Sequence, residues 1–155
     1  KGVKIPALFV AGSVDDVSGY ENGIRAIWQQ TTGVERSLLT FENGNHSSGA
    51  PMPAPMEGWV PSETLGFAPF DHYADAVWDT VRMNNITQHF TTAFLDLHLK
   101  DDQDKAVYLD LLPNAKDGVF SAEEDGSLKP DHTYWKGFPA RTAVGLQFET
   151  KTQGN

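Results

Sequence analysis

The amino-acid sequence predicts an α/β fold in which parallel strands are joined by a crossover helix. Three patterns support this fold class: a nearly continuous apolar segment over 3–11, helical apolar spacing over 20–30, and a second short strand pattern over 35–41. A crossover of this length joins parallel neighbours with right-handed chirality. Both strands are therefore expected to end at the same edge of the sheet. The length of 155 residues is enough for one core, so residues 1–155 are expected to form a single domain.

Local patterns define the first strand, the helix and the second strand. Val3–Ala11 (VKIPALFVA) is rich in branched apolar residues, as a buried parallel strand is. Tyr20–Gln30 has the spacing of an amphipathic helix, and Gly33 is suited to cap its end. Glu35–Phe41 (ERSLLTF) is the second strand. The packing face of the helix is expected to comprise Ile24, Ile27 and Trp28.

A long loop, a long helix and a short β tail are predicted for the rest of the chain. Residues 47–71 are rich in Pro and Gly and form a connection much longer than usual, so they are expected to be a functional loop or a lid. Apolar residues then recur every three to five positions from Tyr73 to Leu97, which indicates a long helix packed on the sheet. A shorter helix is predicted over 105–112 and a strand over 144–150.

Composition excludes several classes of function. The formal net charge of −9 argues against binding to nucleic acid and to anionic membranes, because both need a surplus of Lys and Arg. No apolar run approaches the roughly 18 to 20 residues that cross a bilayer. The absence of cysteine excludes disulfides, thiolate metal sites and a cysteine nucleophile within these residues. It does not distinguish cytosol from export, so the compartment stays open.

Two residues suited to acid–base chemistry follow the two predicted strands. Asp15 lies three residues after Gly12, and His46 follows Gly44 and Asn45. Active sites of open α/β sheets lie beyond the carboxyl ends of the strands, and neighbouring strands are about 5 Å apart, so these side chains are expected to meet. A carboxylate that accepts a hydrogen bond from one imidazole nitrogen fixes the tautomer. It also stabilises the cation that forms when the other nitrogen takes a proton.

Spacing alone leaves a second interpretation open. Asp15 and Asp16 are also suited to cap a turn or a helix start, and His46 to be a loop histidine without a partner. Asp16 is the alternative acid for His46, but the turn after Gly12 favours the third residue. Three further acids are predicted to be charges on a helix face: Asp75, Asp79 and Asp96.

Two segments of the chain carry a resemblance to a known family: Ile5–Gly12 (IPALFVAG) with Asp15, and Gly44–His46 after the second strand. They resemble the late-strand acid and histidine segments of the α/β-hydrolase superfamily, in particular the predicted dienelactone hydrolases and related esterases. Phe94–Lys100 is similar to the C-terminal helix that such enzymes pack against the sheet, and the likeness covers residues 1–112. The resemblance implies that Asp15 is the acid of a catalytic triad and that His46 is its general base.

The resemblance also implies what the chain lacks. In this superfamily the triad runs nucleophile, acid, histidine, and these residues contain no G-x-S-x-G elbow. We therefore expect a serine or cysteine nucleophile upstream of Lys1, with the chain being the C-terminal part of a larger domain. A start without Met, just ahead of a strand, is typical of a fragment or a processed product. The parent enzyme would hydrolyse a carboxylic ester or lactone, whereas the isolated chain is expected to be inactive.

Serines and loop aromatics near the expected site have two interpretations. A serine in an ordinary loop lacks the geometry of an elbow, so turn roles are expected for Ser13, Ser18, Ser47 and Ser48. Side chains of the long loop are candidates to line an acyl or aromatic substrate site, or simply to anchor the loop to the core. These side chains are Met52, Met56, Trp59, Phe67 and Phe70.

Neither a metal nor a cofactor is expected, and one function of a different class stays open. The histidines and acids lack the spacing of zinc, di-metal or calcium sites, and the glycines form no phosphate-binding pattern. The alternative function is a noncatalytic α/β module that binds a partner or self-associates through an uncovered sheet edge. The expected partner is accordingly the missing N-terminal half or a second copy of the chain.

Overall fold

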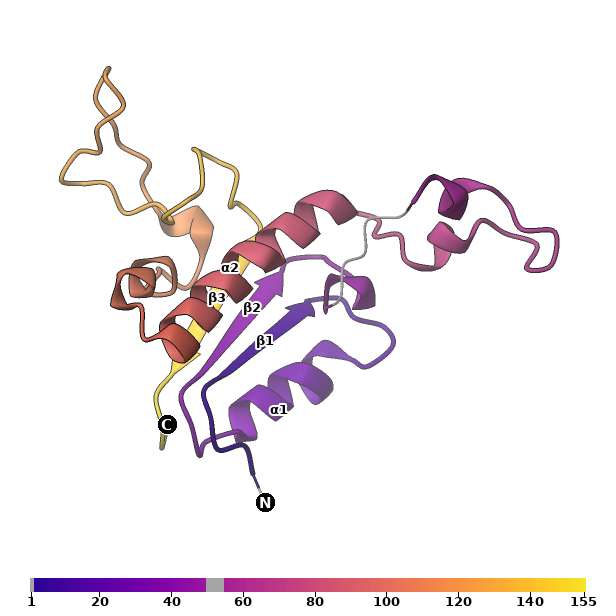
Figure 1. The fold of residues 1–155 in the computed structure, drawn as a ribbon, viewed down its shortest axis with the longest axis horizontal. Helices are drawn as coiled ribbons and strands as arrows, with labels where there is room; N and C mark the ends of the chain where they lie inside the picture. Colours follow the sequence, from indigo (N-terminus) through magenta and orange to yellow (C-terminus); the bar gives the residue numbers. More distant parts are fainter. Residues whose placement is uncertain (1, 50–54) are drawn as a thin grey trace.

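The chain folds as a three-stranded mixed sheet with a helix on each face (Figure 1). The computed structural model describes residues 2–49 and 55–155. The strands are β1 (Ala7–Gly12), β2 (Arg36–Phe41) and β3 (Leu146–Lys151), in the order β1-β2-β3. β1 is parallel to β2, whereas β3 is antiparallel to it. The predicted α/β class and the parallel pairing of the first two strands are thus confirmed.

One helix packs on each side of the central strand. α2 (Thr80–Lys100) covers one face, where Phe90 stacks on Phe148 of β3 with ring centroids 4.9 Å apart. α1 (Arg25–Gln30) covers the other face, where its Trp28 packs in a smaller apolar cluster. Alternate residues of β2 enter the two clusters, so the core lies on both sides of this strand.

Burial in the sheet follows position rather than apolar content. All six residues of β2 (RSLLTF) are buried, although half of them are polar or charged. The more apolar β1 (ALFVAG) is buried only at its last two residues, because it lies at the edge of the sheet. The prediction of a buried strand over Val3–Ala11 is therefore wrong in burial and in its start. Pro6, which has no amide to donate, immediately precedes β1.

Hydrogen bonds satisfy the polar side chains of β2. The guanidinium of Arg36, which is fully buried, donates to the backbone carbonyl oxygens of Trp28, Gln29, Thr152 and Asn155. The first two carbonyls belong to the last turn of α1, where carbonyls lack helical partners and the helix dipole is negative. The hydrogen bonds of Arg36 therefore link the end of α1 to residues 152 and 155.

The predicted first helix is divided. Tyr20–Ile24 forms a single π-helical turn, inside which Gly23 departs from helical geometry with φ −103° and ψ −108°. Only Arg25–Gln30 is α-helical, and Ile27, expected on the packing face, is 55% exposed. The amide and hydroxyl of Thr31 both donate to the Ile27 carbonyl, so this residue and not Gly33 ends the helix.

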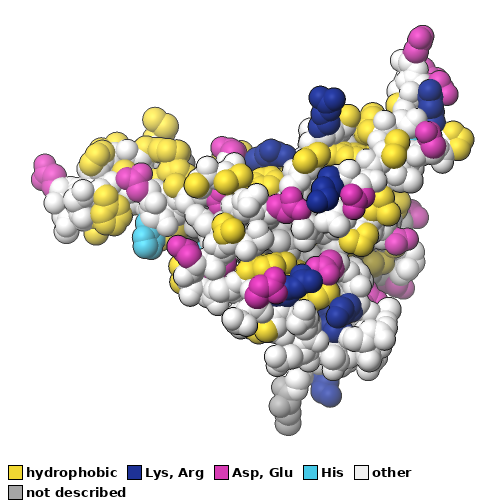
Figure 2. All heavy atoms as spheres, turned by 180° about the vertical axis from the view of Figure 1, so that it is seen from behind, with side chains coloured by type: hydrophobic (Ala, Val, Ile, Leu, Met, Phe, Trp, Pro, Cys, Tyr) yellow, Lys and Arg dark blue, Asp and Glu magenta, His cyan; other side chains and the backbone are white. Residues whose placement is uncertain are grey.

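The residues that precede α2 form an extended arm, which we define as residues 55–79. Two short 3₁₀ turns, Met56–Trp59 and Pro69–His72, lie within it, and it projects from the body of the molecule (Figure 1). Hydrophobic side chains gather on the arm, which is at the left in Figure 2. The most exposed of these are Met56, Trp59, Val60, Leu65 and Val77. The predicted long loop over 47–71 is thus only partly described, since residues 50–54, including Met52, lie outside the described residues, as does Lys1.

The long helix starts later than the apolar spacing predicts. Asp79 is its N-cap and accepts a hydrogen bond from the Arg82 amide, so Tyr73 and Val77 belong to the arm. The expected shorter helix is a 3₁₀ turn, Gln103–Tyr108, and the β tail is formed as β3.

The loops that follow β1 and β2 are packed closely against each other. The Val14 amide donates to the Gly44 carbonyl at 3.0 Å, and the Asn43 amide donates to Ser13 Oγ at 2.8 Å. A Cβ atom placed on Gly12 would overlap the carbonyl oxygens of Gly44 and Asn45. Only glycine therefore permits this close approach.

We predict that Gly12→Ala forces the two loops apart and lowers the free energy of unfolding by about 2 to 3 kcal/mol. Urea denaturation measures this loss. Gly33→Ala is the matched control, because a Cβ there makes only an ordinary contact, 3.6 Å from the Val3 carbonyl oxygen. The control should stay within about 0.5 kcal/mol of wild type. Equal stability of the two variants would contradict the role given to Gly12.

Candidate functional site

Asp15 is held in a fixed position by the loop that follows β1. Its Oδ1 accepts hydrogen bonds from the amides of Val17 and Ser18, both at 2.9 Å. Such a turn fixes the χ1 angle of an aspartate and leaves the rest of the carboxylate free to accept further bonds. Only 9% of the Asp15 side chain is exposed, so the carboxylate is largely shielded from water.

His46 meets this carboxylate from the next loop. It follows β2 as the first residue of the 3₁₀ turn His46–Gly49, and its Nδ1 lies 3.0 Å from both Oδ1 and Oδ2 of Asp15. An ionised carboxylate only accepts hydrogen bonds, so Nδ1 donates the proton of this hydrogen bond, and in the neutral imidazole the lone pair is on Nε2. The His46 side chain is 50% exposed, and no residue of 2–49 or 55–155 forms a hydrogen bond with Nε2.

The surroundings of Asp15 favour its ionised form. Burial raises the pKa of the carboxyl, but the hydrogen bonds from His46, Ser18 and Val17 outweigh this effect and lower the pKa below its ordinary value of 3.8. Asp15 is therefore negatively charged at neutral pH. It accepts from His46 as the acid of a histidine–carboxylate pair does.

A second carboxylate holds the His46 loop from the arm. Asp75 Oδ2 accepts from the Asn45 amide at 2.7 Å, while its Oδ1 accepts from the amides of Val77 and Trp78. The Asn45 side chain in turn donates to the carbonyl of Ala74 at 2.9 Å. The residue next to His46 is thus fixed at both its backbone and its side chain.

The role of Asp75 corrects the prediction of a helix-face charge. Asp75 lies in the arm ahead of α2, and Asp79 caps that helix, so of the three acids only Asp96 lies within it. One local signal was present in the sequence. An aspartate is typical of an Asx turn, in which its side chain accepts hydrogen bonds from backbone amides that follow it. The contact with Asn45, however, joins residues that are 30 positions apart.

The other candidates lie away from His46. Asp16 is exposed and forms no hydrogen bond with a described residue, so the structure brings Asp15 and not Asp16 to the imidazole. Ser13 Oγ accepts from the Asn43 amide, and Ser48 is fully buried with an unpaired hydroxyl. Within the described part of the chain, no serine hydroxyl forms a hydrogen bond with His46. Ser13 and Ser48 lie in the turns that follow β1 and β2.

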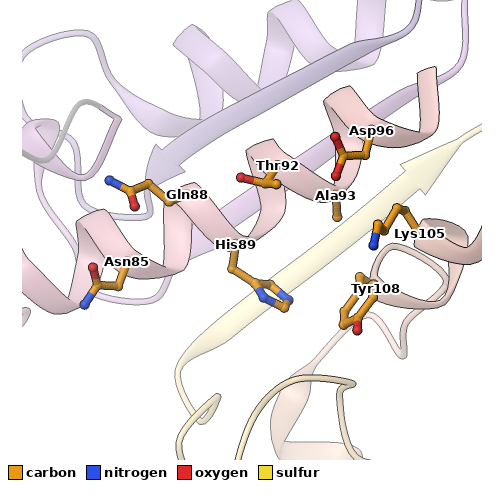
Figure 3. A pocket seen from close by; sticks show the side chains of 8 residues that line it. All are labelled: Asn85, Gln88, His89, Thr92, Ala93, Asp96, Lys105 and Tyr108. Atoms are coloured by element: carbon orange, nitrogen blue, oxygen red, sulfur yellow. The ribbon is translucent and has the colours of Figure 1, made fainter. Parts of the chain in front are cut away.

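The main cavities do not coincide with the Asp15–His46 pair. Figure 3 shows one of about 410 Å³ between α2 and the turn Gln103–Tyr108, with His89 near its centre. The His89 ring packs edge-on against Tyr108 and Phe138, and burial lowers its pKa, so it behaves as a neutral core histidine. Neither Asp15 nor His46 lines any of five main cavities on the described residues. The hydrogen-bond geometry, rather than a cavity, identifies the site.

No group of three or more His, Cys, Asp or Glu side chains in residues 2–49 and 55–155 is arranged to hold a metal ion. In the same ranges, every helix is too short or too polar to cross a membrane.

The lowered pKa of Asp15 predicts a pH-dependent contribution to stability. The ionised carboxylate stabilises the fold above its unfolded pKa, and this contribution is lost as the pH falls through the lower folded pKa. The difference in unfolding free energy between wild type and Asp15→Asn should therefore shrink as the pH drops below 3.8. Urea denaturation from about pH 5 to about pH 2 measures it. A difference that stays constant over this range would contradict the stabilising role of the charge.

Comparison with known proteins gives no relative from which the role of the site could be inferred. No family model, curated protein or solved structure matches the chain.

Proposed function

We propose that this chain supplies the acid and the general base of a carboxylic-ester or lactone hydrolase. Asp15 is the acid, His46 is the base, and the nucleophile comes from residues outside the chain. One observation carries the proposal: His46 Nδ1 lies 3.0 Å from the shielded Asp15 carboxylate, beyond the carboxyl ends of two adjacent parallel strands. This is the position in which open α/β sheets place active sites.

The proposed chemistry uses both nitrogens of His46. Nε2 removes the proton from a serine or cysteine nucleophile as that nucleophile attacks the carbonyl carbon of the substrate. The resulting imidazolium is stabilised by the Asp15 carboxylate through Nδ1, and it then gives its proton to the leaving alkoxide. In the second half of the reaction, Nε2 takes a proton from water as the water attacks the acyl carbon, and the imidazolium then returns that proton to the departing nucleophile, so that the carboxylic acid is released and both groups are regenerated.

We further propose that the chain forms the C-terminal part of an α/β-hydrolase fold. The order of strand, acid, crossover helix, strand, histidine and long helix supports this. The free edge of β1, which pairs with no strand among the described residues, supports it as well. The Ala7 amide donates to the carbonyl of Glu35, just before β2, and the Ser13 amide donates to the carbonyl of Phe41, the last residue of β2. In a parallel ladder the amides of Leu8 and Val10 therefore point away from β2. The strand of the parent domain that precedes β1 in the sheet would pair at this edge.

The same free edge favours a second candidate function, a noncatalytic module that binds a partner or a second copy of the chain. Edge strands offer unpaired amides and carbonyls to other chains, and β1 is only half-buried along its first four residues. The two candidates differ in what they require of Asp15 and His46. Binding through β1 does not depend on these side chains, whereas hydrolysis does.

We predict that His46→Ala in the longer protein lowers kcat for a simple ester or lactone by about four orders of magnitude, because the base is lost. Asp15→Asn should cause a loss of similar order, whereas Asp16→Asn should change kcat by less than about threefold. Initial rates with p-nitrophenyl acetate and a simple lactone measure these effects. Activity that survives His46→Ala, or equal losses at the two aspartates, would refute the assignment.

A further prediction concerns Asp75 as a positioning residue. Asp75→Asn replaces one carboxylate oxygen with an NH₂ group, which cannot accept the hydrogen bonds that Asp75 receives. Loosening of the loop at Asn45 should lower kcat by about tenfold while KM changes little, since the base is displaced rather than removed. Asp71→Asn, an exposed change in the same arm, is the control and should leave both constants unchanged. A change confined to KM would contradict the positioning role.

A further inference from the structure

A cavity of about 390 Å³ lies where the arm joins α2, apart from the cavity in Figure 3. Three aromatic side chains, Trp59, Phe70 and Trp78, and two carboxylates, Asp75 and Asp79, contribute to its lining. This volume is within the range of about 300 to 1,000 Å³ that is typical of small-molecule sites. The combination of aromatic rings and carboxylates restricts the chemistry of a ligand.

All three aromatic side chains that line the cavity belong to the arm, and Trp78 lies two residues before α2. The rings of Trp59 and Phe70 have centroids 3.9 Å apart and are tilted by 43°. Phe70 and Trp78 are each 7% exposed, whereas Trp59 is 55% exposed and lies on the open side. The guanidinium of Arg82 lies 5.0 Å from the centroid of the Trp78 ring, so this indole already takes part in one cation–π interaction.

The two carboxylates lack a cationic partner among the described residues. Neither Asp75 nor Asp79 forms an ion pair in residues 2–49 and 55–155. Their hydrogen bonds come from amide groups, including the Arg82 amide that donates to Asp79 Oδ1. The guanidinium of Arg82 instead donates to the Thr142 carbonyl. Within the described ranges, the cavity wall therefore holds two carboxylates without an ion pair, and the nearby Arg82 guanidinium lies beside the Trp78 ring rather than on a carboxylate.

We propose that this cavity binds a compact organic cation of the quaternary-ammonium type. Such a cation is attracted by aromatic faces and needs no hydrogen-bond acceptor, which suits carboxylates whose oxygens already accept amide hydrogen bonds. It is also less strongly hydrated than a primary ammonium or a metal ion, so it loses little by leaving water. A neutral ligand of the same shape would gain the apolar contacts but not the electrostatic attraction.

The inference goes beyond the proposed hydrolase, because binding a cation requires neither Asp15 nor His46. The cavity nevertheless adjoins the candidate site. Asp75 and Ala74 of its wall hold Asn45, the residue before His46. If both proposals hold, the cation-bearing end of a substrate would be anchored beside the general base. Direct binding measurements test the cavity independently of catalysis.

Isothermal calorimetry with choline and with its uncharged isostere 3,3-dimethylbutan-1-ol tests the proposal. Choline should bind at least about tenfold more tightly than the isostere, because only choline gains cation–π and carboxylate attraction. Equal affinity for the two compounds, or no binding of choline, would overturn the proposal. Either result would leave the hydrolase proposal intact, whereas loss of hydrolysis alone would leave the cavity proposal intact.

Two variants test the cavity residues separately. Trp59→Leu should weaken choline binding by about fivefold, and exposure of this ring makes the variant tolerable for folding. Asp79→Asn removes a charge but keeps a good N-cap for α2, and it should weaken binding by about threefold because the carboxylate is exposed. Asp71→Asn lies outside the cavity and is the matched control. Unchanged affinity in both cavity variants would place choline elsewhere and overturn the assignment.

Discussion

Parallel pairing between β1 and β2 holds the two loops of the candidate site at one edge of the sheet. The register runs from Ala7 opposite Arg36 to Gly12 opposite Phe41, so both strands end together. Gly12 then allows the loops to touch, which a side chain would prevent. A shift of one residue in register would move Gly12 and Phe41 out of alignment and so separate the two loops that carry Asp15 and His46. The contact between Asp15 and His46 therefore depends on the backbone pairing of the two strands.

The central strand is stable in spite of its polarity because the elements around it complete its hydrogen bonds. Arg36 carries a buried charge that forms no ion pair with a described Asp or Glu, yet its donors reach carbonyls at the negative end of α1, and its guanidinium lies 5.7 Å from the Trp28 ring. Ser37 pairs with Thr150 of β3. Burying such groups unpaired would cost several kcal/mol, so the crossover helix and β3 have to be in place around β2.

The parts of the fold that depend on local patterns could be predicted from the sequence, and the parts that depend on distant neighbours could not. The strand–helix–strand order and the choice of Asp15 over Asp16 follow from apolar runs and from the turn after Gly12. The apolar residues of β1 predict a strand that can be buried. Its position at the edge of the sheet depends on the order of the strands, which local sequence does not give. Asp75 was missed because its partner, Asn45, belongs to a different loop.

The unequal exposure of the two site residues matches the division of roles in the proposed mechanism. An acid that orients an imidazole works best when water does not compete for its oxygens, and the Asp15 side chain is 9% exposed. A general base must reach a substrate or a nucleophile, and His46 is half exposed with Nε2 unbonded among the described residues. If the pair were only structural, burial of both partners would give the stronger contact. The exposed imidazole beside a shielded carboxylate therefore favours a site in which His46 exchanges a proton with a substrate or a nucleophile.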